Sequence, residues 1–105
     1  MTVSFFAIYK VPADKAVFDA HYFGTHRQLA QAIPGLLDYR INRVVASQMG
    51  ESDLHMIVEL VFESHPALKA AMASPQAKAA AQDVLKFGGE VVRFYVTEPA
   101  SGPVI

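Results

Sequence analysis

Four segments of this chain are rich in β-branched and aromatic residues, and apolar side chains alternate along them. The alternation is clearest at 54–63, where Leu54, Met56 and Val58 occupy every second position. A period of two residues is typical of a strand that is buried on one face. We therefore predict strands over 3–10, 36–47, 54–63 and 90–97.

The segment 13–33 has the three- and four-residue spacing of an amphipathic helix. Its apolar stripe consists of Phe18, Tyr22, His26, Leu29 and Ile33. The pair Pro34-Gly35 is a strong stop signal and ends this helix. Gly24 lies near its middle and costs about 1 kcal/mol relative to alanine, so we expect a kink there.

A second helical region follows the third strand. Ser64 is a favourable N-cap, and a proline two residues later fits the first turn. Ser74 precedes another proline, so it can interrupt this region and cap a further helical stretch that runs through Leu85. Gly88 and Gly89 then break the chain before the last strand.

The predicted order is strand, helix, strand, strand, helix, strand. This is the split βαβ arrangement of the α+β ferredoxin-like fold, with a four-stranded antiparallel sheet and both helices on one face. The other face must be covered by something, and a second identical sheet would close a dimeric α/β barrel. We therefore expect a homodimer of one domain, 1–99, with a flexible tail at 100–105.

Reading each strand with period two assigns the side chains to two faces of the sheet. One face is almost entirely apolar and suits packing under the helices. It carries Phe5, Ala7, Tyr9, Tyr39, Ile41, Met56, Val58, Leu60, Phe62, Val92, Phe94 and Val96. The other face carries Phe6, Ile8, Arg40, Asn42, Val44, Ile57, Glu59, Val61, Val91, Arg93 and Tyr95.

The second face mixes apolar residues with Arg40, Asn42, Glu59 and Arg93. This mixture suits a cavity that holds a small, partly polar ligand, so these four residues are candidates for substrate binding. A hairpin centred on 49–50 would place Arg40 opposite Glu59. The alternative is a dimer interface with cross-strand ion pairs and no ligand.

Composition excludes several functional classes. The 105 residues are 52% hydrophobic and only 18% charged, below the usual ~25%, which favours an oligomer that hides apolar surface. With a net charge of −1 and scattered basic residues, nucleic-acid binding is not expected. No apolar run is long enough for a membrane span, and we expect a cytoplasmic protein. The absence of cysteine excludes disulfides and thiolate chemistry.

The four histidines are the general acid and base candidates. His26 lies on the apolar stripe of the first helix. Five residues of α-helix advance about 500°, so His21 should lie about 140° away from it, and we expect no metal site formed by this pair. His65 at a helix start and His55 at a strand start are predicted to lie at the surface.

Several motifs occur in the order found in the EthD family, which this chain resembles over nearly its whole length. In this sequence they are Tyr9-Lys10-Val11-Pro12-Ala13-Asp14, Phe18-Asp19-Ala20-His21-Tyr22, Thr25-His26, Leu29-Ala30, Ile33-Pro34-Gly35-Leu36, Ala67-Leu68, Ala73-Ser74-Pro75, Asp83 and Phe87. The combined pattern of the first helix is the most specific part of the resemblance.

The resemblance implies a dimeric α/β barrel in which His26 lies at the cleft between helix and sheet as the candidate catalytic residue. Tyr9, Tyr22 and Tyr39 are the aromatic neighbours that the family pattern places near it. The family is named for a gene cluster that degrades a fuel ether, where its members are accessory to an oxidising system. The chain departs from the pattern at 27–28, where Arg-Gln fills positions at which the family often has proline.

Three functional hypotheses follow. The first is a cofactor-independent isomerase, lyase or monooxygenase of degradative metabolism, in which His26 moves a proton and a tyrosine or Arg93 steadies an enolate. The second is a non-catalytic accessory protein that binds a small organic molecule for an oxidising partner system. The third is haem binding through His26, which no further feature of the sequence favours. We expect no cofactor.

Overall fold

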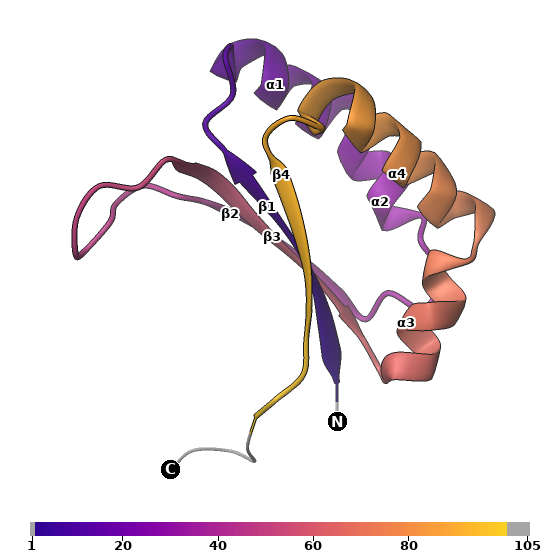
Figure 1. The fold of residues 1–105 in the computed structure, drawn as a ribbon. Coiled ribbons are helices and arrows are strands. Elements are labelled where there is room, and N and C mark those ends of the chain that lie inside the picture. Colours follow the sequence, from indigo (N-terminus) through magenta and orange to yellow (C-terminus); the bar gives the residue numbers. More distant parts are fainter. Residues whose placement is uncertain (1, 101–105) are drawn as a thin grey trace.

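The computed structural model describes residues 2–100 as a sheet covered by a layer of helices (Figure 1). The elements are β1 (Val3–Lys10), α1 (Lys15–His21), the π-helical turn η1 (Tyr22–His26), α2 (Arg27–Gln31), β2 (Asp38–Arg43), β3 (Leu54–Phe62), α3 (His65–Met72), α4 (Pro75–Gly88) and β4 (Val92–Thr97). Except for residue 100, the predicted tail lies outside the described residues.

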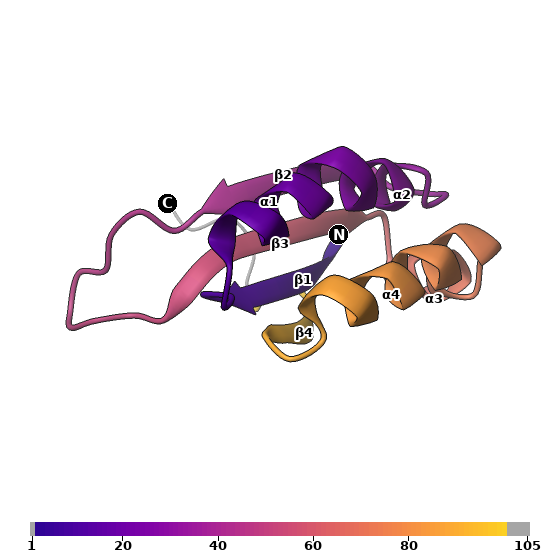
Figure 2. The same ribbon diagram turned by 90° about the horizontal axis from the view of Figure 1, so that it is seen from above.

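The four strands form one antiparallel sheet in the order β2-β3-β1-β4. All helices lie on the same face of this sheet, and the opposite face is uncovered (Figure 2). This confirms the predicted α+β ferredoxin-like fold with βαββαβ order. No helix within residues 2–100 is both long enough and apolar enough to cross a bilayer.

The helix starts follow from side-chain capping. The carboxylate of Asp14 accepts a hydrogen bond from the Val17 amide at the start of α1. The hydroxyls of Ser64 and Ser74 accept hydrogen bonds from backbone amides three residues later, at the starts of α3 and α4. Both serine caps were predicted. Gly35, with φ of 79°, reverses the chain after α2 in a conformation that glycine adopts without steric cost.

The register of the strands confirms the two predicted faces. Ala7 of the central strand β1 pairs with Val58 and Phe94, and this row lies under the helices. Ile8, the next residue of β1, pairs with Ile57 and Arg93 on the uncovered face. The two lists of side chains therefore keep the phases expected from period two.

Several element bounds differ from prediction, and those of β2, β4 and α4 differ as follows. β2 spans only Asp38–Arg43, so the loop that connects it to β3 covers 44–53 and is longer than the predicted hairpin loop centred on 49–50. β4 begins at Val92, not at residue 90. α4 continues through Gly88, because this glycine packs against the ring of Tyr9. A Cβ at Gly88 would lie 3.2 Å from Tyr9 Cε1, so the missing side chain serves close packing rather than helix termination.

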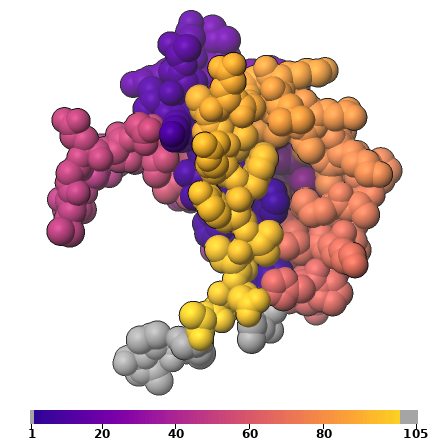
Figure 3. Space-filling view, viewed as in Figure 1, coloured from indigo at the N-terminus to yellow at the C-terminus, as the bar shows by residue number. Residues whose placement is uncertain are grey.

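The core lies between the sheet and the helices, and it is incomplete at one side. Tyr9, Tyr22 and Phe62 are fully buried there. Along the edge strand β4, by contrast, Phe94 is 45% and Val96 52% exposed although both face the helical side. The space-filling view shows the hollow that this leaves between β4 and the helices α3 and α4 (Figure 3).

Candidate functional site

The first helix is interrupted by the π-helical turn η1 at the point where a kink was expected. The Arg27 amide donates to the Tyr22 carbonyl five residues earlier, instead of the four of an α-helix. This wider turn brings His21 and His26 to the same side of the helix. Our prediction that these two histidines point in different directions was therefore wrong, because it assumed an uninterrupted α-helix.

Both histidines contact one carboxylate, that of Asp83 on α4. His21 Nε2 lies 2.9 Å from Asp83 Oδ1, and His26 Nδ1 lies 3.0 Å from Asp83 Oδ2. Phe87, one turn further along α4, covers the pair, with ring centroids 4.6 Å from His21 and 5.1 Å from His26. The result is a His–Asp–His cluster held between two helical segments.

The cluster changes the ionisation of its members. Burial alone would raise the pKa of Asp83, but hydrogen bonds from His21 and then His26 outweigh it and hold the pKa below its usual value. For His26, burial lowers the pKa, and the contact with Asp83 offsets this only in part. At neutral pH, Asp83 is therefore ionised and His26 is neutral.

These charge states assign the tautomer of His26 from its hydrogen bonds. A carboxylate can only accept, so the Nδ1–H of His26 donates to Asp83. The opposite nitrogen, Nε2, then carries a free lone pair. It has no hydrogen-bond partner within residues 2–100, and it is not among the fully buried atoms. His26 is only 7% exposed and lines a chamber that opens at the surface between β4 and the helices (Figure 3), so Nε2 is a candidate base for a molecule bound there.

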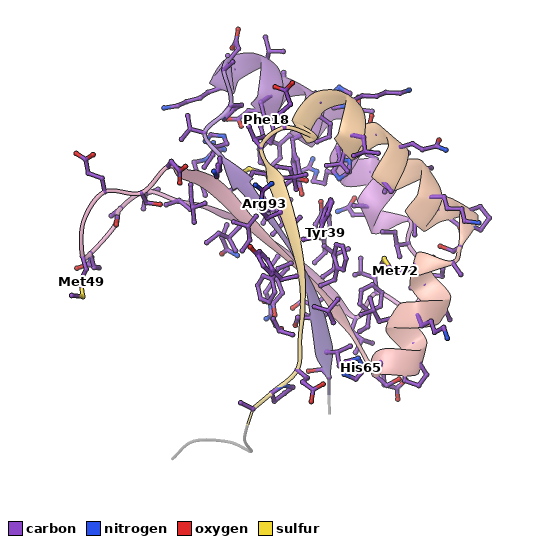
Figure 4. All side chains as sticks on the ribbon, in the orientation of Figure 1. Phe18, Tyr39, Met49, His65, Met72 and Arg93 are labelled. Carbon is purple, nitrogen blue, oxygen red and sulfur yellow. The ribbon has the colours of Figure 1, made fainter. Side chains whose placement is uncertain are left out.

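The chamber lies between the helix-facing side of the sheet and the helices, and it has a volume of about 270 Å³. Figure 4 shows Tyr39 and Met72 pointing into this space from β2 and α3. Apart from His26 and three tyrosines, its walls are apolar. The lining residues are Phe5, Ala7, Tyr9, Tyr22, His26, Ala30, Ile33, Tyr39, Val58, Leu60, Met72, Ala77, Ala80, Ala81, Val84 and Phe94.

The three tyrosines supply the other polar atoms of the chamber. The hydroxyls of Tyr22 and Tyr39 are 2.7 Å apart and hydrogen-bond to each other. Tyr9 is 1% exposed, and its hydroxyl has no hydrogen-bond partner within residues 2–100. Burial raises the pKa of all three phenols, so they remain protonated at neutral pH.

The structure divides the predicted site residues between the two faces of the sheet. Tyr9, Tyr22, Tyr39 and His26 come together at the chamber. Arg40, Asn42, Glu59 and Arg93 lie on the opposite, uncovered face, so they do not meet this group.

The polar side chains of the uncovered face are largely satisfied by the chain itself. As predicted, Arg40 stands opposite Glu59, and Arg40 Nη1 lies 3.1 Å from Glu59 Oε1. Arg40 also binds Asp38, with Nε 2.8 Å from Oδ2, and the Ser4 hydroxyl donates to Glu59 at 2.7 Å. Asn42 donates to the Ile57 carbonyl at 3.3 Å. These contacts tie neighbouring strands together.

Two features were missed from the sequence. Asp83 was noted only as part of the family pattern, and no local signal relates it to His26, which lies 57 residues earlier. His55 was predicted at the surface but is only 8% exposed, because Phe18 and Asp19 of α1 cover it; its Nε2 lies 2.8 Å from Asp19 Oδ1. Among residues 2–100, no group of three or more histidine, aspartate or glutamate side chains is arranged to hold a metal ion.

Several solved structures share this fold at low sequence identity. The cofactor-independent oxygenase SnoaB from Streptomyces nogalater is 17% identical, with a TM-score of 0.64 over 95% of this chain and 94% of that one. A dimeric ferredoxin-like protein of unknown function from Jannaschia is 14% identical, with a TM-score of 0.70 over 94% of this chain and 100% of that one.

Two relatives are closer in sequence. An ethyl tert-butyl ether degradation (EthD) family protein from Bacillus halodurans is 39% identical, with a TM-score of 0.90 over 94% of this chain and 99% of that one. An uncharacterised 11.0 kDa protein from the thcB-thcC intergenic region of Rhodococcus erythropolis is 32% identical over 87% of this chain and 88% of its own length. The profile of the EthD domain matches residues 10–89. This chain therefore belongs to the EthD family.

Proposed function

We propose that this protein binds a small, partly apolar organic molecule in the chamber and that His26 removes a proton from it without a cofactor. The observation that carries the proposal is the pairing of His26 with Asp83. The carboxylate fixes the imidazole at Nδ1 and leaves Nε2 unpaired in a residue that lines the largely apolar chamber. A base that is oriented by a carboxylate and kept neutral by burial is well suited to proton abstraction.

The chemistry needs a group that stabilises the charge left on the ligand. The protonated hydroxyl of Tyr9 is suited to donate a hydrogen bond to an enolate or phenolate oxygen in the chamber. The imidazolium formed at His26 is stabilised by the ionised Asp83. Return of the same proton to another atom would complete an isomerisation. The cofactor-independent oxygenase activity of SnoaB, which shares only the fold, is in keeping with such chemistry.

We also propose that the protein is a homodimer through the uncovered face of the sheet. Phe6, Ile8 and Ile57 form an apolar strip on this face, with Arg40 and Glu59 paired beside it. Covering this strip with the same strip of a second copy would bury it, as in an isologous interface. The dimeric ferredoxin-like protein from Jannaschia supports this arrangement by its fold.

A deuterium-exchange experiment tests proton abstraction directly. The protein is incubated with the enolisable ketone 2-tetralone in D₂O, and loss of the α-proton signal is followed by NMR. We expect exchange above the rate in buffer, reduced about 100-fold or more in His26→Gln. The matched control His65→Gln alters an exposed histidine at the start of α3 and should exchange like the wild type.

The second candidate function is ligand binding without catalysis, and the largely apolar lining of the chamber favours it. In that case 2-tetralone would raise the thermal midpoint of the protein, yet exchange would stay at the buffer rate. Equal exchange in the wild type and in His26→Gln would refute the catalytic role of His26. A chamber that binds none of a panel of phenols, ketones and lactones would refute both functions.

A further inference from the structure

The polar end of the chamber offers a matched donor and acceptor. Nε2 of His26 accepts a hydrogen bond, and the hydroxyl of Tyr9 donates one. Neither atom has a partner within residues 2–100, and neither is sealed from the chamber. The hydroxyls of Tyr22 and Tyr39 share one hydrogen bond, which uses the hydrogen of the donating hydroxyl and leaves that of the accepting one. A ligand with one acidic proton and one oxygen acceptor would satisfy both free groups at once.

No charged side chain lines the chamber. The carboxylate of Asp83 lies behind the wall formed by His26, whose Nδ1 is 3.0 Å from Asp83 Oδ2. After burial and Tyr39, this negative charge is a further cause that raises the pKa of Tyr9. The positive charge of Arg27 lowers the pKa of Tyr22 and Tyr39, against the larger effect of burial. Its guanidinium is exposed and stacks over the ring of Phe23 at 5.6 Å, so solvent screens this charge.

An anion in this chamber would lose part of its hydration without gaining a counter-ion from the lining residues, and it would approach Asp83. Burial of an unpaired charge is expensive, whereas a neutral hydroxyl that donates to His26 keeps its hydrogen bond. The volume of about 270 Å³ lies just below the range of drug-sized pockets, which limits the ligand to about one or two rings.

We propose that the chamber selects uncharged, one- or two-ring phenols or enolisable ketones and excludes carboxylates of the same shape. This inference rests on the proposed function, because it assigns the substrate class of the same site. The specificity comes from the site's charge: a neutral imidazole and neutral phenols in the walls, with an anionic aspartate behind them.

Matched pairs of probes test this selection by titration calorimetry at pH 7. The pairs are 2-naphthol with 2-naphthoate and 4-methylphenol with 4-methylbenzoate; the first member of each is neutral at this pH. We expect the neutral member to bind at least about tenfold more tightly, since a carboxylate would give up hydration without gaining a counter-ion from the lining residues. Asp83→Asn removes the negative charge, so it should reduce the ratio of affinities between the neutral and the charged probe. His65→Gln should leave this ratio unchanged.

The outcomes separate this inference from the proposed function. Equal or tighter binding of the carboxylates would overturn the inference alone, because the chamber would still hold a ligand. Binding of none of the four probes would overturn the inference together with the proposed function. An unchanged preference in Asp83→Asn, with the variant folded by circular dichroism, would also count against the inference, since the aspartate charge would then not contribute to selection.

Discussion

The hydrogen bond between Tyr22 and Tyr39 allows a quantitative test of how the chamber is held together. It joins η1 to the edge strand β2 across an oxygen–oxygen distance of 2.7 Å. Tyr22 is 1% exposed, so its hydroxyl has little access to bulk water. Changing either residue to phenylalanine removes one partner and leaves the other hydroxyl unpaired. We expect each single change to cost about 1–3 kcal/mol of unfolding free energy.

The double variant should lose much less than the sum of the single losses. Once both hydroxyls are gone, neither position leaves a hydroxyl without its partner, and the two rings still fill the same space. The coupling energy of the two residues should therefore be about 1 kcal/mol or more. Urea unfolding of the wild type, both single variants and the double variant, at one protein concentration, measures all four free energies.

Additive losses would refute this reasoning. They would mean that each hydroxyl makes its own hydrogen bonds, for example to water in the chamber, and that the pair does not connect η1 to β2. Phe23→Leu, in the neighbouring half-buried ring, is a useful control, since it should cost packing energy with no coupling specific to Tyr39.

Three further predictions concern the histidines and the dimer. Burial lowers the pKa of His26 from its usual 6.5, so as the pH falls through 6.5 the unfolded chain takes up a proton that the folded chain does not. The wild type should therefore lose unfolding free energy over this pH range, and His26→Gln should lose less; equal losses in urea unfolding would contradict this prediction. His21→Gln should raise the pKa of His26 in an NMR titration, since the charge on His21 is one of the causes that lower it; no change, or a decrease, would show that the two do not share Asp83. In sedimentation, the wild type should be a dimer and Phe6→Lys a monomer, while the control Val17→Lys, on the exposed surface of α1, should stay dimeric. A monomeric wild type at micromolar concentration would refute the proposed barrel.

Most of the fold was predictable because local patterns and global topology agree. From Met56 onward, the alternation in β3 assigned the residues to the correct face, and a hairpin centre near 49–50 was enough to pair Arg40 with Glu59. It failed at His55, where the register of β1 and β3 shifts and the imidazole lies under α1. Ser64 and Ser74 marked helix starts by a mechanism that depends only on the next three residues. The length of β2 was overestimated because apolar residues beyond Arg43 continue a strand-like pattern, whereas pairing with β3 does not go past the bond from the Val44 amide to the His55 carbonyl.

The site was predictable only in part, since it depends on contacts between distant segments. His26 and its tyrosine neighbours were predicted from the family pattern, but their alignment with Asp83 required the register of η1 and the packing of α4. Gly24 was the one visible sign of an irregular turn. The polar residues of the uncovered face drew attention because of their composition, although their placement separates them from His26 by the thickness of the sheet.

The π-helical turn also bears on how this protein can change in length. In an α-helix, two side chains lie on the same face when they are four positions apart. His21 and His26 are five positions apart, so the helix contains one extra residue between them. The π-helical turn accommodates the extra residue within η1, so that α1 and α2 follow each other without a break in the helical segment. Loss of Gly24, which has no neighbour within 4 Å of its missing side chain, would leave histidines four residues apart in a regular helix and still on one face. In evolutionary terms, this is a place where an insertion or deletion within a packed helix is compatible with an intact site.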